Sequence, residues 1–424
     1  MRPIREVAGL FFLASSQPGC RGFKRRKRLR NRFAGFLAGA LLYACPANAS
    51  DLSSPADYAV PDFANAAVRW NWEARDLVRR SRSDPLWAAR SYAISSIAQY
   101  EAARKASAAP AENREAFVDL AIGTASALTL AHLFPHDAPR VTAMHVAHVK
   151  ILESSLSADE ATRAQAIGTA AAGTILKARE ADGSISLEAA PPPLNAKAWF
   201  SSEDWPPQRT YWGKVRPFLA ESIARFDPPP PPLNDVAFQR ALDEVRQARA
   251  DNPARNDELA KKWADGPGTP TPPGRWNKIA AALIAERSLD ELSSTRILAY
   301  LNMALVDASI ACWHAKFRYW LLRPSQADGR IVPTYPLPNF PAYPSGHATF
   351  SATAATFLSD VFPDQKGRLT AMAEEAARSR VVGGIHYPFD ASAGLDQGRE
   401  VARLAVARFR SDRQEPADQG GHHD

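Results

Sequence analysis

Apolar residues recur along most of the chain with the spacing of an α-helix. The clearest examples are three alanine-rich segments that begin near Asp, Asn or Ser, namely Ser83 to Ala106, Arg114 to Phe134 and Ala158 to Glu180. Alternating runs of β-branched residues, which would indicate strands, are missing from the sequence. The pattern therefore predicts an all-α fold made of one or more large helical bundles.

Prolines interrupt the helical pattern most strongly between residues 184 and 233. Clusters of two to five prolines there cannot be helical throughout, so we expect an extended connection that crosses the surface. The predicted organisation is an N-terminal helical region, this connection, a C-terminal helical bundle and a disordered tail, at residues 50–183, 184–233, 234–412 and 413–424.

A second stretch rich in proline and glycine, Asp265 to Trp276, predicts a long covering loop. Trp263 and Trp276 stand at its ends, and large aromatic side chains favour burial. We therefore expect this loop to pack against the helices.

Residues 1–49 have the features of a secretory signal. Basic residues from Lys24 to Arg32 precede the apolar run FAGFLAGALLYAC and the small-residue site Ala47-Asn48-Ala49. We expect export to the periplasm or the medium, with cleavage after Ala49; the alternative is a basic tail with a short buried helix. Lipid anchoring at Cys45 is less favoured because Tyr43 is bulky for such a site.

The basic charge of the chain is concentrated in this leader. The net charge is +7, but residues 1–49 hold ten Lys and Arg and one Glu, which leaves 42 basic and 44 acidic residues in the rest. A general nucleic-acid-binding surface is therefore not expected. After residue 49 we expect no transmembrane span, and Cys312 is the only cysteine left, which excludes an internal disulfide there.

The segment Ser293 to Pro324 predicts one long helix ended by proline. Trp313, Lys316, Trp320 and Arg323 recur along one face of it at i, i+3, i+7 and i+10. Taken alone, the two cations would indicate a basic edge on a core helix.

Two further segments place polar groups where helices are expected to begin. In FPAYPSGHATF a helix would start at Ser345-Gly346, where free N–H groups and the helix dipole favour an anion, with His347 beside them. In SRVVGGIHYPFDASAG, Arg380 precedes a turn at Gly383-Gly384, and a helix would begin at Pro388. Asp390 follows His386 by four residues, close enough to orient its imidazole.

Together these segments resemble the signature of the type 2 phosphatidic acid phosphatase and vanadium haloperoxidase superfamily. Its pattern is K-x6-R-P, then P-S-G-H, then S-R-x5-H-x3-D, and every fixed position is filled here. Most of the chain after the leader is also similar to the helical scaffold of bacterial vanadium-dependent haloperoxidases. The spacing of 31 residues between His347 and Ser379 is shorter than in fungal chloroperoxidases, and HYPFD is similar to endings common in phosphatases.

The resemblance implies roles for ten residues. Lys316, Arg323 and Arg380 would neutralise the oxygens of a vanadate or phosphate, with the Ser345 hydroxyl and Gly346 N–H as further donors. His386 would be the axial ligand of the vanadium or the nucleophile on phosphorus, oriented by Asp390, and His347 would be the acid or base. Trp313 and Phe340 would line a halide site.

Two activities share such a shell of cations. We expect a vanadate-dependent haloperoxidase that oxidises halide with hydrogen peroxide to hypohalous acid. The first alternative is a periplasmic acid phosphatase that hydrolyses soluble phosphomonoesters through a phosphohistidine and needs no cofactor. The second is a non-catalytic oxyanion-binding protein. For His145, His148, His314 and Cys312, packing or surface roles are favoured over metal binding or nucleophilic chemistry.

Overall fold

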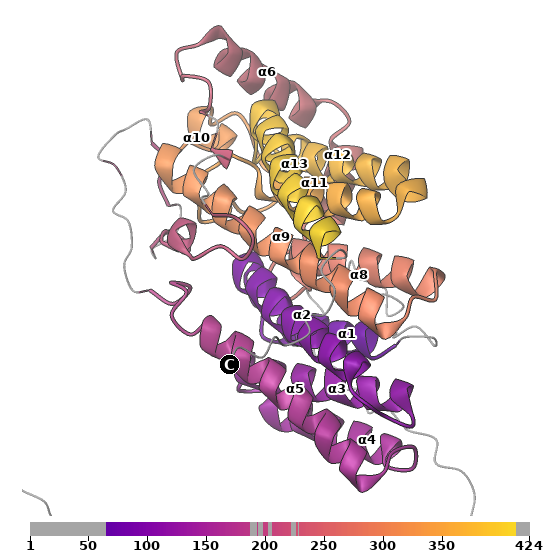
Figure 1. Ribbon diagram of the computed structural model, residues 1–424. Helices are drawn as coiled ribbons and strands as arrows, with labels where there is room; N and C mark the ends of the chain where they lie inside the picture. The colour runs from indigo at the N-terminus through magenta and orange to yellow at the C-terminus, as the bar shows by residue number, and fades with distance from the viewer. Residues whose placement is uncertain are drawn as a thin grey trace, which may run out of the picture. The chain divides into compact units, whose positions relative to one another are not determined.

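The computed structural model describes residues 65–186, 193, 198–201, 206–221, 226–227 and 229–412, which belong to one compact unit. The expected signal segment and the expected C-terminal tail lie outside the described residues. Within the described part of the chain there are 13 α-helices and no strand, which confirms the all-α fold (Figure 1). The predicted division into domains stays a prediction.

The first five helices begin where capping residues stand in the sequence. Asp84 accepts hydrogen bonds from the backbone N–H groups of Leu86 and Trp87, and Ser157 forms a capping box with Glu160. The three helices predicted in this region are confirmed to within two residues at each end. The bounds are α1 Ala66–Arg80, α2 Pro85–Ala108, α3 Arg114–Leu133, α4 Ala138–Leu152 and α5 Ala158–Ala178.

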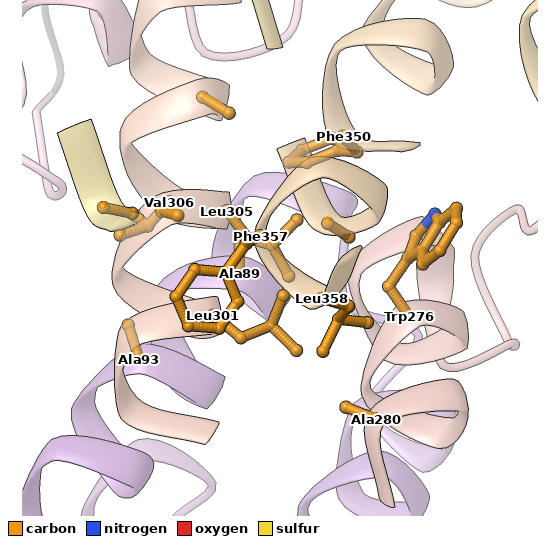
Figure 2. Close-up of a cluster of buried hydrophobic side chains, with 14 of the residues drawn as sticks. Ala89, Ala93, Trp276, Ala280, Leu301, Leu305, Val306, Phe350, Phe357 and Leu358 are labelled. Atoms are coloured by element: carbon orange, nitrogen blue, oxygen red, sulfur yellow. The ribbon is translucent and has the colours of Figure 1, made fainter. Parts of the chain in front are cut away.

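The later helices surround a core that draws on both halves of the chain. Their bounds are α6 Val236–Ala250, α7 Pro253–Lys262, α8 Thr271–Glu286, α9 Glu291–Tyr319, α10 Pro324–Ala327, α11 Gly346–Val361, α12 Lys366–Val382 and α13 Pro388–Ser411. Helix α9 packs against α2, α11 and α13, and α11 packs against α12 and α13. Figure 2 shows residues of α2, α8, α9 and α11 meeting in one apolar cluster, which packs α9 and α11 against each other.

Helix α9 ends earlier than the sequence predicts. It stops at Tyr319, and Trp320 takes a left-handed conformation with φ 49°. Arg323 is extended, with φ −72° and ψ 155°, because the proline that follows disfavours the helical region for the residue before it. The prediction of one continuous helical face from Trp313 to Arg323 was therefore wrong for Trp320 and Arg323.

The expected covering loop is also shorter than predicted. Helix α8 begins at Thr271, so the loop covers only residues 263–270. Two prolines in the first turn of α8 are compatible with a helix because the N–H groups they lack have no partner there. Trp263 and Trp276 are both buried, which confirms that the loop packs down.

The proline-rich connection does not simply cross the surface. Trp212 is buried in a short 3₁₀ turn, Trp212–Lys214, and its indole N–H donates to Ser309 on α9 at 2.8 Å. The buried Asp307 carboxylate accepts the backbone N–H groups of Phe218, Leu219 and Ala220 at 2.6 to 2.9 Å. Aromatic residues among the prolines supply enough apolar area to draw these described parts of the connection into the core.

Two helices, α3 and α9, are long and apolar enough to cross a membrane by length and composition alone. The absence of a transmembrane span after residue 49 stays a prediction. In the fold, 78% of the apolar window of α3 and 83% of that of α9 are buried, as in core helices of globular proteins.

Candidate active site

Lys316 lies in the last turn of α9 and is fully buried. Its ammonium donates to the carbonyl oxygens of Pro341, Ala342 and Pro344 at 2.8, 3.0 and 2.6 Å. An ammonium has three N–H donors, so each of them meets a backbone carbonyl. Lys316 therefore holds the turn that leads into Ser345, and it adds a positive charge to the site.

Arg323 reaches the same place from the segment after α9. Its Nε and Nη2 donate to the carbonyl of Phe340 at 3.2 and 2.9 Å, and its Nη1 donates to the carbonyl of Ile385 at 2.8 Å. The same Nη1 lies 3.0 Å from Nε2 of His386. One guanidinium thus joins the segments that carry the second and third sequence motifs.

His386 is oriented by Asp390 at the start of α13. Its Nδ1 lies 2.9 Å from Oδ2 of Asp390, and that oxygen also accepts the backbone N–H of Tyr387 at 3.0 Å. Both contacts of the ring are explained if Nδ1 carries the proton and Nε2 accepts from Arg323. His386 therefore presents the lone pair of Nε2 to the cation cluster.

Helix α11 begins at the predicted place. Ser345 is its N-cap, and its hydroxyl accepts the N–H of Ala348 at 3.4 Å. The backbone N–H of Ser345 donates to the carbonyl of Asp390 at 3.0 Å, which ties the first turn of α11 to that of α13. Gly346 lies against the Trp313 ring: a Cβ added there would be 3.7 Å from it.

His347 and Arg380 complete the group from two other helices. His347, in the first turn of α11, has Nε2 3.2 Å from the carbonyl oxygen of Ala264. Arg380, near the end of α12, is buried; its Nε donates to the Ser379 hydroxyl at 2.9 Å and its Nη2 to the carbonyl of Ala260. Both residues act electrostatically on His386, as do Lys316 and Arg323.

The buried charges of this cluster do not balance. Lys316, Arg323 and Arg380 are cations. Two carboxylates influence their pKa values: Asp390, which is hydrogen-bonded to His386, and Asp265, which is paired with Arg275. Buried cations are costly unless an anion accompanies them. The cluster is therefore suited to binding an oxyanion.

The pKa shifts follow from the same burial. Burial lowers the pKa of Lys316, and it lowers that of Arg323 to about 10. Burial, followed by the charges of Arg323 and Lys316, holds the pKa of His386 well below its usual value. Burial and then Arg380 do the same for the pKa of His347. Both imidazoles are therefore neutral at pH 7, and burial raises the pKa of Asp390.

An aromatic pair borders the cations. The ring centroids of Trp313 and Phe340 are 4.8 Å apart, and the Lys316 ammonium lies 5.7 Å from the first and 5.1 Å from the second. The indole N–H of Trp313 donates to the carbonyl of Gln208 at 3.2 Å. All ten residues singled out in the sequence thus fall in one connected region at the ends of α9, α11, α12 and α13.

The backbone partners of the site were not predicted from the sequence. The carbonyls of Ala260 and Ala264, which receive Arg380 and His347, come from the end of α7 and the loop after it. Side-chain identity carries no signal for a backbone carbonyl, so no motif could have indicated them. The histidines judged unrelated do lie elsewhere: His148 pairs with Asp119 at 2.9 Å, and no cluster of potential metal ligands occurs in the described part of the chain.

The chain also matches a known protein family and two known enzymes over part of its length. Residues 296–413 match the PAP2 superfamily. A non-specific acid phosphatase from Providencia stuartii is 27% identical over 194 residues, which cover 43% of this chain and 72% of that protein. A vanadium chloroperoxidase from Curvularia inaequalis is 24% identical over 250 residues, which cover 47% of this chain but only 41% of that protein.

Solved structures share the fold over a longer stretch. A bacterial vanadium-dependent iodoperoxidase superposes with a TM-score of 0.71 and 22% identity, covering 81% of this chain and 95% of that one. A bacterial vanadium-dependent chloroperoxidase superposes with a TM-score of 0.63 and 15% identity, covering 78% and 93%. At these identities the likeness shows a common fold.

Proposed function

We propose that this chain, of which residues 296–413 match the PAP2 superfamily and which is similar to an acid phosphatase and to a vanadium chloroperoxidase, is a vanadate-dependent haloperoxidase. The reaction would join a halide, hydrogen peroxide and a proton to give hypohalous acid and water. The proposal has two parts, an oxyanion centre and a halide niche, and different observations support each.

The oxyanion centre is supported by the excess of buried cations. Three cationic side chains, Lys316, Arg323 and Arg380, lie around the single His386–Asp390 pair. This donor set fits vanadate: guanidinium forks match its oxygens, and the neutral His386 offers Nε2 as a nitrogen ligand. Arg323, whose Nη1 lies 3.0 Å from Nε2 of His386, would be one of the residues that hold the anion.

The halide niche is the observation that favours a haloperoxidase. Trp313 and Phe340 form an apolar wall next to the ammonium of Lys316. Such a wall would partly desolvate a halide, while the nearby cation would attract it. Hydrolysis of a phosphomonoester does not require an apolar wall of this kind. We therefore place the halide site of the proposed reaction at these two rings.

The residues of the chain would divide the work as follows. Bound vanadate would activate hydrogen peroxide toward the halide, and the oxidation state of the vanadium would not change. Arg323 and Arg380 would bind its oxygens, and Asp390 would keep the Nδ1 proton of His386 in place. His347, neutral at pH 7, would be the acid–base group: it would accept a proton from hydrogen peroxide at Nδ1 and return it to the product.

A phosphatase is the second candidate because the acid phosphatase relative is matched over most of its length. The same neutral Nε2 of His386 could attack phosphorus, and His347 would protonate the leaving alcohol. A non-catalytic oxyanion-binding protein is less well supported, because binding alone does not require two histidines with pKa values held low.

The two activities are separated by one pair of assays on the purified protein after residue 49. Halide oxidation with peroxide is measured after loading with vanadate, and phosphate release from a phosphomonoester is measured without it. We expect vanadate-dependent oxidation that is lost in His386→Ala. Efficient phosphate release that vanadate blocks, with no halide oxidised at any loading, would replace the proposal with the phosphatase.

A further inference from the structure

We propose that Arg275 is a positioning residue for His347, which it controls by holding the carbonyl of Ala264 in place. The role of His347 in proton transfer rests on the proposed function, but the geometry of the contact does not. Arg275 lies on α8, before the stretch that matches the superfamily, and it was not singled out by any motif.

Arg275 donates hydrogen bonds to the loop on both sides of Ala264. Its Nη2 donates to the carbonyl of Lys262 at 2.7 Å, and its Nε and Nη2 donate to the two carboxylate oxygens of Asp265 at 2.6 and 2.7 Å. The guanidinium carbon lies 4.8 Å from the centroid of the Trp263 ring. One side chain thus fixes residues 262, 263 and 265, and Ala264 between them has little freedom.

Two further features of the loop are consistent with its being held by these hydrogen bonds. Asp265 has φ 44°, a left-handed conformation that costs free energy in a residue other than glycine and persists only where neighbouring contacts impose it. On the far side, the indole N–H of Trp263 donates to Glu375 on α12 at 2.7 Å. The loop is therefore held between α8 and α12, with the Ala264 carbonyl directed at His347.

The backbone of both Ala264 and Trp263 hydrogen-bonds the His347 ring, and the Ala264 carbonyl does so at Nε2. A carbonyl accepts and cannot donate, so Nε2, 3.2 Å away, must be the protonated nitrogen. The neutral ring then has Nδ1 as its acceptor, which is the form that can take a proton. The charged groups that act on the ring are Arg380 on α12 and Arg275 on α8, and both favour the neutral imidazole.

Loss of the Arg275 side chain would remove its hydrogen bonds to Asp265 and Lys262. The Ala264 carbonyl would then be free to move, and His347 would no longer be restricted to one tautomer. We expect Arg275→Met to lower kcat by about 10-fold or more, since a misplaced acid–base group loses part of a 100- to 10,000-fold contribution. The affinity for orthovanadate should change less than kcat does, because Arg275 donates to residues 262 and 265 of the loop, whereas Lys316, Arg323 and Arg380 would bind the anion.

The decisive readout is the ring of His347, observed by ¹⁵N NMR in full-length protein labelled at histidine. The signals are assigned by comparison with His347→Gln, at a pH where the ring is neutral. Wild type should show protonation at Nε2, and Arg275→Met should show a mixture of both tautomers. Arg275→Lys keeps the charge and part of the hydrogen bonding, so it should show an intermediate proportion of the two tautomers. Arg287→Met removes an exposed ion pair with Asp364 just after α8 and should match wild type.

Protonation of His347 at Nδ1 in the wild type would overturn the proposal, and so would unchanged ¹⁵N signals in Arg275→Met. If Arg275→Met does not fold, Arg275→Lys and the wild-type spectrum still decide. These spectra need no turnover, so failure of the haloperoxidase assignment and failure of the Arg275 proposal can be told apart.

Discussion

Buried charge shapes the site at the scale of single residues. Lys316, Arg323 and Arg380 are held in place by backbone carbonyls, so their positions do not depend on a bound anion. Donors that are already oriented stabilise developing negative charge without reorganisation.

Removal of one of these cations should affect activity far more than removal of a neighbour on the same helix. We expect Arg380→Met to lower kcat/KM on the order of 100-fold or more, as for the loss of one oxyanion donor. Arg378→Met is the matched control because Arg378 lies two residues away on α12 and is exposed. Equal losses in the two variants would contradict the assignment of Arg380.

The low pKa of His347 should make the protein less stable in acid. Below about pH 6.5 the unfolded chain binds a proton at this histidine that the folded protein does not, so a decrease in pH favours unfolding. Between about pH 6.5 and 5, the free energy of unfolding of wild type should fall more steeply than that of His347→Gln. The excess is at most about 1.4 kcal/mol per pH unit.

Urea unfolding of the two proteins at a series of pH values, in buffer without phosphate or vanadate, measures this difference. The comparison isolates His347, because His386 contributes to both curves. Parallel curves would mean that His347 titrates normally in the folded protein.

The sequence predicted the charged and imidazole groups of the site but not what holds them. Lys316, Arg323, Arg380 and the two histidines are recognisable because their spacing matches a motif. Their partners are mostly backbone carbonyls, in loops at Phe340, Pro341 and Ala264 and near the end of α7 at Ala260, and any residue type can supply a carbonyl.

At the scale of helices, the site depends on the close approach of α11 and α13. A Cβ at Gly394 would lie 2.6 Å from the Ser345 carbonyl oxygen, and one at Gly398 would lie 2.4 Å from the Thr349 carbonyl oxygen. Two glycines one helical turn apart thus let α13 rest on the backbone of α11. This contact sets the distance between the two helix starts that carry His347 and His386.

A methyl group at Gly398 should therefore destabilise the protein. Its nearest neighbours are backbone atoms of α11, which cannot turn away, so we expect Gly398→Ala to cost about 1 to 3 kcal/mol. Gly367→Ala on α12 meets nothing within 4 Å and should be neutral or stabilising by up to about 1 kcal/mol. Thermal and urea unfolding of both variants measure the effect; a stabilised Gly398→Ala would show that the helices are not in such contact.

Helix ends were the least predictable elements. The periodicity of α9 continues past Tyr319 because Trp320 and Leu321 are also buried, so burial alone did not reveal where the helix stops. For α8, prolines that suggested a loop occupy the first turn of a helix. In both cases the decisive factor is the backbone conformation of one residue, which composition does not specify.

At the scale of the whole molecule, helices from both halves of the chain form one core around α9. The N-terminal helix α2 packs on the helix that carries Lys316, although the superfamily match covers only residues 296–413. We infer that the matched stretch needs the preceding helices to bury its apolar surface.

Export is a further prediction at this scale, and it concerns residues outside the described part of the chain. Amino-terminal sequencing of protein from the native cell envelope or medium should give Ser50 as the first residue. A cytoplasmic protein that retains Lys24 to Arg32 would contradict it, and a lipid on Cys45 would support the anchored alternative.

The central claim is that Lys316, Arg323, Arg380 and His386 form one oxyanion centre, and calorimetric titration with orthovanadate tests it most directly. Wild type should bind one equivalent per chain, phosphate should compete, and Arg380→Met should bind at least about 10-fold more weakly while Arg378→Met binds like wild type. An absence of saturable binding, or equal affinity in wild type, Arg380→Met and His386→Ala, would contradict the claim.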